Sequence, residues 1–278
     1  MNNALRRLYA FSNTWTGTII IVLLVIFFVA QAFVIPSGSM KKTLLIGDHL
    51  FVKKFSYGIP TPHLPWLEVP VLPDFKGNGH LVDGEKPKRG DIVVFRFPKE
   101  PKIHYVKRCV ATGGDEIIYH DKNLYISFAE GDAYMKENFP KEKLVSLMGK
   151  IWVNNPYKER FKGVQYDNEV DLFEQMNMFL LTGDLDMKPL LVGELPEKIG
   201  FNHNAFYKKV ENEQYYMIGD NRDHSNDSRF WGSVPYKLIV GKPWFIYFSW
   251  DDKYQIRWNR IGRFIDTVEN NEEFLSGN

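Results

Sequence analysis

A long apolar run near the N-terminus constrains this chain more than any other feature of its sequence. Every residue from 19 to 30 is apolar, and after Gln31 the run resumes until Pro36. Residues 15–35 would form about 31 Å of helix at 1.5 Å per residue, which matches a hydrocarbon core of ~30 Å. Trp15 would lie at the interface, and Pro36 would end the helix. The run therefore predicts one transmembrane helix over residues 15–35.

The same segment also has the three parts of a cleavable secretory signal. Arg6 and Arg7 form a basic start, the apolar run follows, and Ala30-Gln31-Ala32 has small residues at the spacing of a cleavage site. An anchor and a cleaved signal are equal alternatives on these residues alone. Both place the rest of the chain outside the cytoplasm. Flanking charges do not decide the orientation, because a long folded domain crosses a membrane regardless of them.

The composition of the whole chain excludes several classes of protein. The 35 Lys and Arg residues nearly balance the 34 Asp and Glu residues, whereas a nucleic-acid binder normally carries a basic excess. With 44% hydrophobic residues, the chain is not an acidic disordered protein. The single Cys109 excludes an intrachain disulfide and a cysteine zinc cluster, and the histidines form no H-E-x-x-H motif. We expect no metal, no cofactor and no nucleic acid partner.

After Pro36 the sequence turns β-rich. Short β-branched and aromatic runs, bounded by Gly, Pro, Asn and Asp, predict the strands of an antiparallel sheet or barrel-like assembly. Residues 56–90 hold many prolines and glycines and predict an extended loop, and residues 129–212 lack a regular period and resemble an inserted subdomain. The predicted strands cover residues 49–52, 91–97, 103–111, 116–119, 124–128, 150–153, 214–218 and 238–248.

Lys107 is a candidate general base within the predicted strand 103–111. Alternation of side chains places it on one face with Tyr105 and Cys109, whereas Arg108 points to the other face. An exposed lysine, with a pKa near ~10.4, is almost never neutral at pH 7, but burial lowers the pKa and makes the amine a usable base. The alternative is an edge strand, or an amine that reaches water past its apolar stem.

Ser39 is the candidate nucleophile. It follows Ser37 and Gly38 directly after Pro36, and a serine needs a neighbouring base and donors for the developing oxyanion. The turn could offer a backbone N–H, and the Ser37 hydroxyl could add a second donor. The alternative is that Ser-Gly-Ser forms only a turn.

The segment from Gly219 to Arg229 is dense in small polar and charged residues. It is either a surface loop with ion pairs or part of a site. A calcium loop is excluded, because Ser228 and Val234 stand where such a loop needs Gly and Glu. A histidine base for the serine, His104 or His224, is a further alternative.

In their order along the chain, these segments resemble the bacterial type I signal peptidases, membrane-anchored serine proteases with a Ser–Lys dyad. Two positions depart from the family's pattern, Lys42 in place of a proline and Gly113-Gly114-Asp115 in place of Pro-Gly-Asp. The segments similar to the family's boxes are 36–41 (nucleophile), 90–95 (next strand), 105–111 (lysine base) and 219–232 (last box).

The resemblance implies a role for each matching residue. Ser39 would attack the scissile carbonyl, and neutral Lys107 would take its proton. The Ser39 backbone N–H and the Ser37 hydroxyl would form the oxyanion hole, and Ser225 would orient the Lys107 amine. The supporting charge network would consist of Asp227, Arg229 and Arg108.

The resemblance also implies the fold and its division. We expect a mainly β protein, with an antiparallel catalytic core, an inserted cap subdomain and one N-terminal transmembrane helix. The acidic tail is expected to be frayed. The predicted parts are residues 1–14 (cytoplasmic N-terminus), 15–35 (transmembrane helix), 36–114 and 214–268 (core), 115–213 (cap) and 269–278 (tail).

The implied partners are secretory preproteins, cut after small residues at positions −1 and −3, and the lipid bilayer, with the export translocon nearby. The implied location is the bacterial cytoplasmic (inner) membrane, as a single-pass protein with a cytoplasmic N-terminus and an extracytoplasmic, periplasmic catalytic domain. Ala32 is only seven residues from Ser39 and is expected to continue the helix. Cleavage of the chain by itself is then geometrically poor, so we predict that the anchor is retained.

Two other functions are open from the sequence. One is a related Ser–Lys protease that cuts itself, as repressor-type peptidases do, although the predicted membrane helix and the lack of a DNA-binding half count against it. The other is a non-enzymatic, membrane-anchored binding module. The module predicts that Ser39→Ala and Lys107→Met leave function intact, whereas the peptidase predicts a near-total loss.

Overall fold

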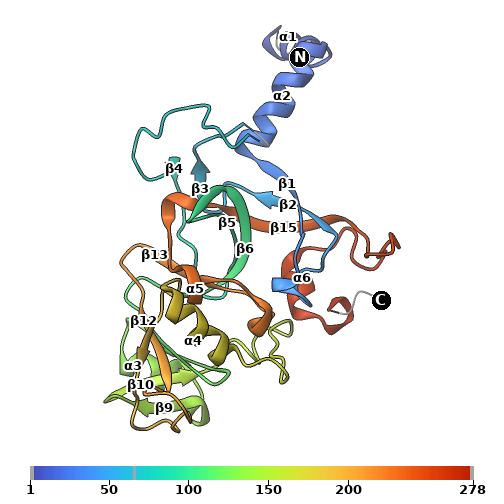
Figure 1. Cartoon of the computed structure of the whole chain (residues 1–278). Helices are drawn as coiled ribbons and strands as arrows, with labels where there is room; N and C mark the ends of the chain where they lie inside the picture. The colour runs from blue at the N-terminus through green and yellow to red at the C-terminus, as the bar shows by residue number, and fades with distance from the viewer. Residues whose placement is uncertain (1–2, 65–66, 276–278) are drawn as a thin grey trace.

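Residues 3–64 and 67–275 are described by a computed structural model. Within them the fold is mainly β, and every pairing between its named strands is antiparallel, as expected. Two larger sheets lie one below the other in Figure 1, with α2 projecting above them and the C-terminal segment to one side. A two-stranded sheet joins β3 (Gly58–Pro60) and β4 (His80–Asp83).

The larger sheet has seven strands, which come from the N-terminal and the C-terminal parts of the chain. Its predicted strands 91–97, 103–111, 214–218 and 238–248 are confirmed to within a few residues. In sheet order the strands are β1 (Ala30–Val34), β2 (Asp48–Lys53), β15 (Ile239–Ser249), β5 (Ile92–Phe97), β6 (Glu100–Thr112), β13 (Gln214–Ile218) and β14 (Val234–Pro235).

The second sheet has six strands, all from residues 116–209. These residues fall inside the segment predicted as the cap, and the division of the chain into core and cap stays a prediction. In sheet order the strands are β11 (Lys188–Leu190), β12 (Ala205–Lys209), β7 (Glu116–His120), β8 (Asn123–Ser127), β10 (Lys150–Asn154) and β9 (Leu144–Leu147).

Helices are short and connect or cover these sheets. The α-helices are α1 (Asn3–Ser12), α2 (Trp15–Phe28), α3 (Asp132–Asn138), α4 (Leu172–Thr182), α5 (Ser228–Trp231) and α6 (Ile265–Asn270). The 3₁₀ turns are η1 (Gly38–Met40), η2 (Lys141–Lys143), η3 (Arg222–His224), η4 (Tyr236–Leu238) and η5 (Glu272–Phe274).

The N-terminal apolar run forms a helix and a strand instead of one helix. α2 ends at Phe28, and β1 pairs with β2 from Ala30↔Lys53 to Val34↔His49. The predicted helix over 15–35 is therefore wrong from residue 30 onward, and Ala30-Gln31-Ala32 lies in a strand. Apolar residues fit a strand as well as a helix, and β2 offers these residues hydrogen-bond partners. No helix in residues 3–64 and 67–275 has both the length and the apolarity to cross a membrane.

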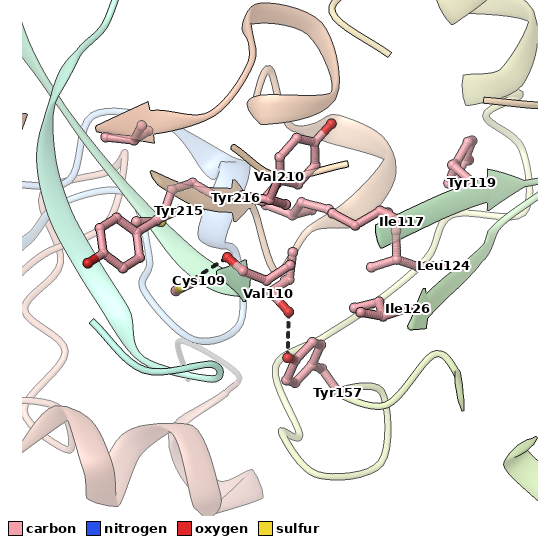
Figure 2. Close-up of a cluster of buried hydrophobic side chains, with 14 of the residues drawn as sticks. Cys109, Val110, Ile117, Tyr119, Leu124, Ile126, Tyr157, Val210, Tyr215 and Tyr216 are labelled. Atoms are coloured by element: carbon pink, nitrogen blue, oxygen red, sulfur yellow. Dashed lines mark hydrogen bonds between the residues drawn. The ribbon is translucent and has the colours of Figure 1, made fainter. Parts of the chain in front are cut away.

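The largest hydrophobic core joins the two sheets. Val110 of β6 and Tyr216 of β13 pack in one cluster with Ile117 of β7 and Leu124 of β8, all fully buried or nearly so. Figure 2 shows these side chains together, with the Tyr157 hydroxyl donating a hydrogen bond to the Val110 carbonyl at 2.6 Å. Because part of β6 is packed into this core, the other side chains of β6 are also held in fixed positions.

The start of the acidic tail is packed against the domain, not frayed. Glu269 is buried at the end of α6, and Phe274 of η5 lies in a second hydrophobic cluster with Leu50 and Ile246. Residues 276–278 of the predicted tail, and residues 1–2 of the predicted N-terminal segment, lie outside the described residues.

Candidate active site

Ser39 lies in the turn η1, directly after the strand that the apolar run forms. The turn is fixed to the segment 219–232 by backbone contacts: the Asn221 N–H donates to the Ser39 carbonyl at 3.1 Å, and the Asn221 side-chain amide donates to the Gly38 carbonyl at 2.9 Å. Two motifs that are 180 residues apart in the sequence therefore form one rigid unit around the serine.

Lys107 lies beside this serine. Its Nζ is 2.7 Å from Ser39 Oγ and 3.0 Å from the Val106 carbonyl oxygen. β6 is an interior strand, paired with β5 and β13, and the Lys107 residue is 4% exposed. The alternatives of an edge strand and of an amine that reaches water are therefore wrong, and the predicted pair of Ser39 and Lys107 is brought together.

The surroundings of Lys107 favour its neutral form. Burial lowers the pKa of Lys107 to about 8, and the negative charges of Asp227 and then Asp220 oppose this shift without reversing it. In the described part of the chain no carboxylate forms an ion pair with this amine. With a pKa of about 8, roughly a tenth of the amine is neutral at pH 7.

Arg108, the next residue, has carboxylate partners. Its guanidinium donates two hydrogen bonds to Asp220, at 2.8 and 2.7 Å, and one each to Glu269 and to the Gly90 carbonyl, at 2.9 and 2.7 Å. Asp220 also accepts a hydrogen bond from the Thr43 hydroxyl at 2.6 Å. Each nitrogen of the guanidinium thus donates at least one hydrogen bond, although no part of the arginine is exposed.

Asp227 and Arg229 form a separate pair. The Arg229 guanidinium donates to both Asp227 oxygens at 2.8 Å, and Asp227 accepts the Gly219 N–H at 3.2 Å. The structure therefore brings together only two members of the predicted network, because Arg108 pairs with Asp220 instead. Sequence reasoning missed Asp220 although it lies in the last box, where an acidic residue was available for the buried arginine.

The comparisons with known proteins agree with this geometry. A sequence model of the family described as "Signal peptidase, peptidase S26" matches residues 8–250. The chain is 47% identical over 283 aligned residues to a signal peptidase I of Helicobacter pylori, which covers 95% of this chain and 96% of the relative. The chain belongs to the signal peptidase family, peptidase S26. It is a hydrolase, and its resemblance to the type I signal peptidases is confirmed.

More distant signal peptidases also match. A signal peptidase I of Pseudomonas aeruginosa is 31% identical over 256 residues, covering 88% of this chain and 74% of the relative. A solved signal peptidase I of Enterococcus faecalis is 19% identical and aligns with 57% of this chain and 97% of its own, with a TM-score of 0.29. That last likeness is too distant to inform the fold.

Two other residues predicted for this signal peptidase's site lie close to the pair. Ser37 Oγ is 3.4 Å from Ser39 Oγ. Ser225 is buried, but its hydroxyl has no hydrogen-bond partner among the described residues, so the predicted bond to Lys107 is not formed. A Cβ at Gly219 would lie 2.3 Å from Ser225 Oγ and 2.4 Å from the Ser39 carbonyl oxygen. Only glycine therefore allows these segments to approach so closely.

Neither candidate histidine contacts the serine. Burial, followed by the charges of Arg96 and Lys54, lowers the pKa of His104 to about 4. His224 is exposed, and its Nε2 lies 2.9 Å from Asp167 Oδ2. The alternative of a histidine base is therefore not supported. Within residues 3–64 and 67–275, no three His, Cys, Asp or Glu side chains gather closely enough to hold a metal ion.

The pair opens into a cavity of about 490 Å³. Its lining includes Ile35, which follows β1, Ile103 of β6, and Asn221, His224 and Asn226 from the segment 219–232. This arrangement can receive a peptide that passes the serine, with the lysine amine below it in a site shielded from water.

Proposed function

We propose that this signal peptidase removes N-terminal signal peptides from exported preproteins by means of a serine nucleophile and a lysine general base. The observation that carries this proposal is the buried contact of 2.7 Å between Lys107 Nζ and Ser39 Oγ. A serine hydroxyl at this distance can donate to a neutral amine, which is the geometry that general-base catalysis requires.

In the first step, neutral Lys107 takes the hydroxyl proton while Ser39 Oγ bonds to the scissile carbonyl carbon. The carbon–nitrogen bond then breaks, and the resulting ammonium gives its proton to the leaving amine of the mature protein. The signal peptide is now joined to Ser39 Oγ through an ester bond. Water, deprotonated by the same amine, hydrolyses this ester and releases the signal peptide. Each proton is thus taken up and returned by one side chain.

Two donors are available for the developing oxyanion. The Ser39 N–H belongs to the first turn of η1, where backbone donors lack intrahelical acceptors. The Ser37 hydroxyl lies beside it, 3.4 Å from Ser39 Oγ. We assign both to the oxyanion hole, Ser225 to orienting the amine when substrate is bound, and Asp227, Arg229 and Arg108 to fixing the loop that carries the site.

The substrate and location follow from the same reasoning. Shallow pockets lined by Ile35 and Ile103 would admit small side chains at positions −1 and −3 and exclude larger ones. α2 exposes the apolar side chains of Ile19, Val22 and Leu24, which supports attachment to a lipid bilayer. We place the catalytic domain on the periplasmic side of the bacterial inner membrane, near the export machinery.

The test is cleavage of a detergent-solubilised preprotein by the wild type and three variants. Ser39→Ala and Lys107→Met should each abolish cleavage while the protein stays folded. Lys102→Met is the matched control, because Lys102 lies on the same strand but is exposed, and it should cleave normally. Full activity of either active-site variant would refute the proposal and favour a non-enzymatic module.

A further inference from the structure

A second cavity, of about 400 Å³, adjoins the catalytic one on the side of α4. His224 and Asn226 line both cavities, so only this short segment separates them. Gln175 and residues 223–226 form a polar part of the lining of the second cavity, and Leu172 and Phe179 of α4 and Phe230 of α5 form an apolar part. None of these three residues takes part in the proposed reaction.

The α4 cavity is formed in advance. Leu172 and Phe230 are buried, and the rings of Phe179 and Phe230 meet edge to face with centroids 5.1 Å apart. Phe179 is 45% exposed at the mouth. Asp223, the acidic residue in the lining, is paired with Lys122 at 3.3 Å. The cavity therefore has one apolar wall that is fixed by packing, and its volume is typical of the smaller ligand pockets.

The position of the cavity indicates which part of a substrate would reach it. A signal peptide is N-terminal to the bond that is cut, and the proposed substrate is held in the bilayer through that part. In Figure 1, α2 and β1 lie above the catalytic strands and α4 lies below them. The lining of the catalytic cavity includes Ile35, directly after β1, and also His224 and Asn226, which it shares with the α4 cavity. The chain beyond the cut bond would therefore leave towards α4.

We propose that the α4 cavity binds an apolar side chain of the mature segment, within the first few residues after the cleaved bond. This inference rests on the proposed function. The apolar lining selects an aromatic or large aliphatic side chain, since such a side chain gains from leaving water. His224 also lines a third, polar cavity, together with Lys41, Gln165 and Glu169. If the mature segment entered that cavity instead of the α4 cavity, the enzyme would prefer a polar side chain.

The test measures kcat/KM on a set of matched preprotein peptides. The parent peptide has serine at each of the first five positions after the bond, and each derivative carries one phenylalanine, lysine or aspartate there. We expect one position at which phenylalanine raises kcat/KM about tenfold over serine. No effect at any position, or a preference for a charged residue, would overturn the proposal.

Variants of α4 then locate the effect. Phe179→Ser and Gln175→Trp should both remove the preference for phenylalanine, the first by deleting the lining and the second by filling the cavity. Met178→Ser is the control, because Met178 is 65% exposed on the same helix and does not line the cavity. Retention of the preference in both lining variants would refute the site.

The parent serine peptide keeps this test separate from the proposed function. It should be cleaved equally by the wild type and the three α4 variants. If it is cleaved and phenylalanine has no effect, the α4 cavity is not a subsite and the proposed function stands. If no peptide or preprotein is cleaved by the folded wild type, the proposed function itself fails.

Discussion

Lys107 and Arg108 are neighbours on β6 and both are buried, but among the described residues only Arg108 has carboxylate partners. Arg108 is surrounded by Asp220, Glu269 and a carbonyl oxygen, whereas the Lys107 amine contacts a hydroxyl, a carbonyl oxygen and the Tyr105 ring. Burial lowers the pKa of both cations, but the carboxylates raise the pKa of Arg108 above its usual value. The comparison teaches that burial alone does not decide the pKa of a cation: burial without a paired carboxylate lowers the pKa, whereas paired carboxylates keep it high.

The largest expected effect comes from giving Lys107 a charge that it cannot lose. Lys107→Arg keeps a long cationic side chain, but a guanidinium is not deprotonated at any working pH. We expect kcat/KM for a preprotein to fall on the order of 10⁴-fold, as when a nucleophile's base is removed. Arg108→Lys serves as the reciprocal control and should reduce activity far less. Activity within tenfold of wild type in Lys107→Arg would contradict a neutral amine as the base.

Removing the charge of Arg108 should cost stability. Arg108→Met leaves Asp220 and Glu269 buried without their partner, and breaking a buried pair in this way costs about 3–5 kcal/mol of unfolding free energy. Chemical denaturation measures this difference. Lys88→Met is the control, because its ion pair with Glu85 is exposed on both sides and should contribute far less to stability. Equal losses in the two variants would show that the Arg108 pairing is not stabilising.

The pH dependence of the rate should follow the amine. The pKa of Lys107 is lowered to about 8, and only the neutral form accepts a proton. Below that pH kcat/KM should therefore fall about tenfold per pH unit, and above it the rate should level off. The profile is read from initial rates between pH 5 and pH 10. A flat profile from pH 5 to pH 9, with chemistry rate-limiting, would exclude an amine base.

The smallest expected effect comes from removing a negative charge near Lys107. Asp227 does not pair with Lys107, but its charge raises the pKa of that amine. Asp227→Asn should therefore shift the midpoint of the pH profile to a lower pH, together with some loss of stability because Arg229 loses its partner. Glu85→Gln, on the exposed surface, should leave the midpoint in place. A shift to higher pH in Asp227→Asn would show that its charge does not act on the amine.

Much of the fold could be predicted because most strands are short β-branched runs bounded by turns. The predicted runs 91–97 and 214–218 agree with β5 and β13. The error lay where composition does not distinguish a helix from a strand: the mostly apolar Ala30–Val34 fits either state, and the pairing with the neighbouring strand β2 decides it. α4 was missed although its sequence carries helix signals: Leu172, Phe173 and Met176 are buried at helical spacing between the N-cap Asp171 and the C-cap Gly183.

The candidate site was predicted in part for a similar reason. Ser39 and Lys107 lie in motifs whose chemistry is visible locally, and alternation along the strand separates Lys107 from Arg108. The partners of Arg108 were not found, since Glu269 comes from α6 near the end of the chain and no local pattern links the two residues. We predicted a single charge network of Arg108, Asp227 and Arg229. The structure instead forms two separate pairs, Arg108 with Asp220 and Arg229 with Asp227.

The junction between α2 and β1 fixes where the strand begins relative to the end of the helix. Only Val29 separates the two elements, and its N–H donates to Val25 while its carbonyl accepts from Lys54. The five residues of β1 span about 17 Å at ~3.3 Å each, and three more residues lead to η1, which holds Ser39. The distance between the end of α2 and Ser39 is thereby set by the length of this strand and the short segment after it.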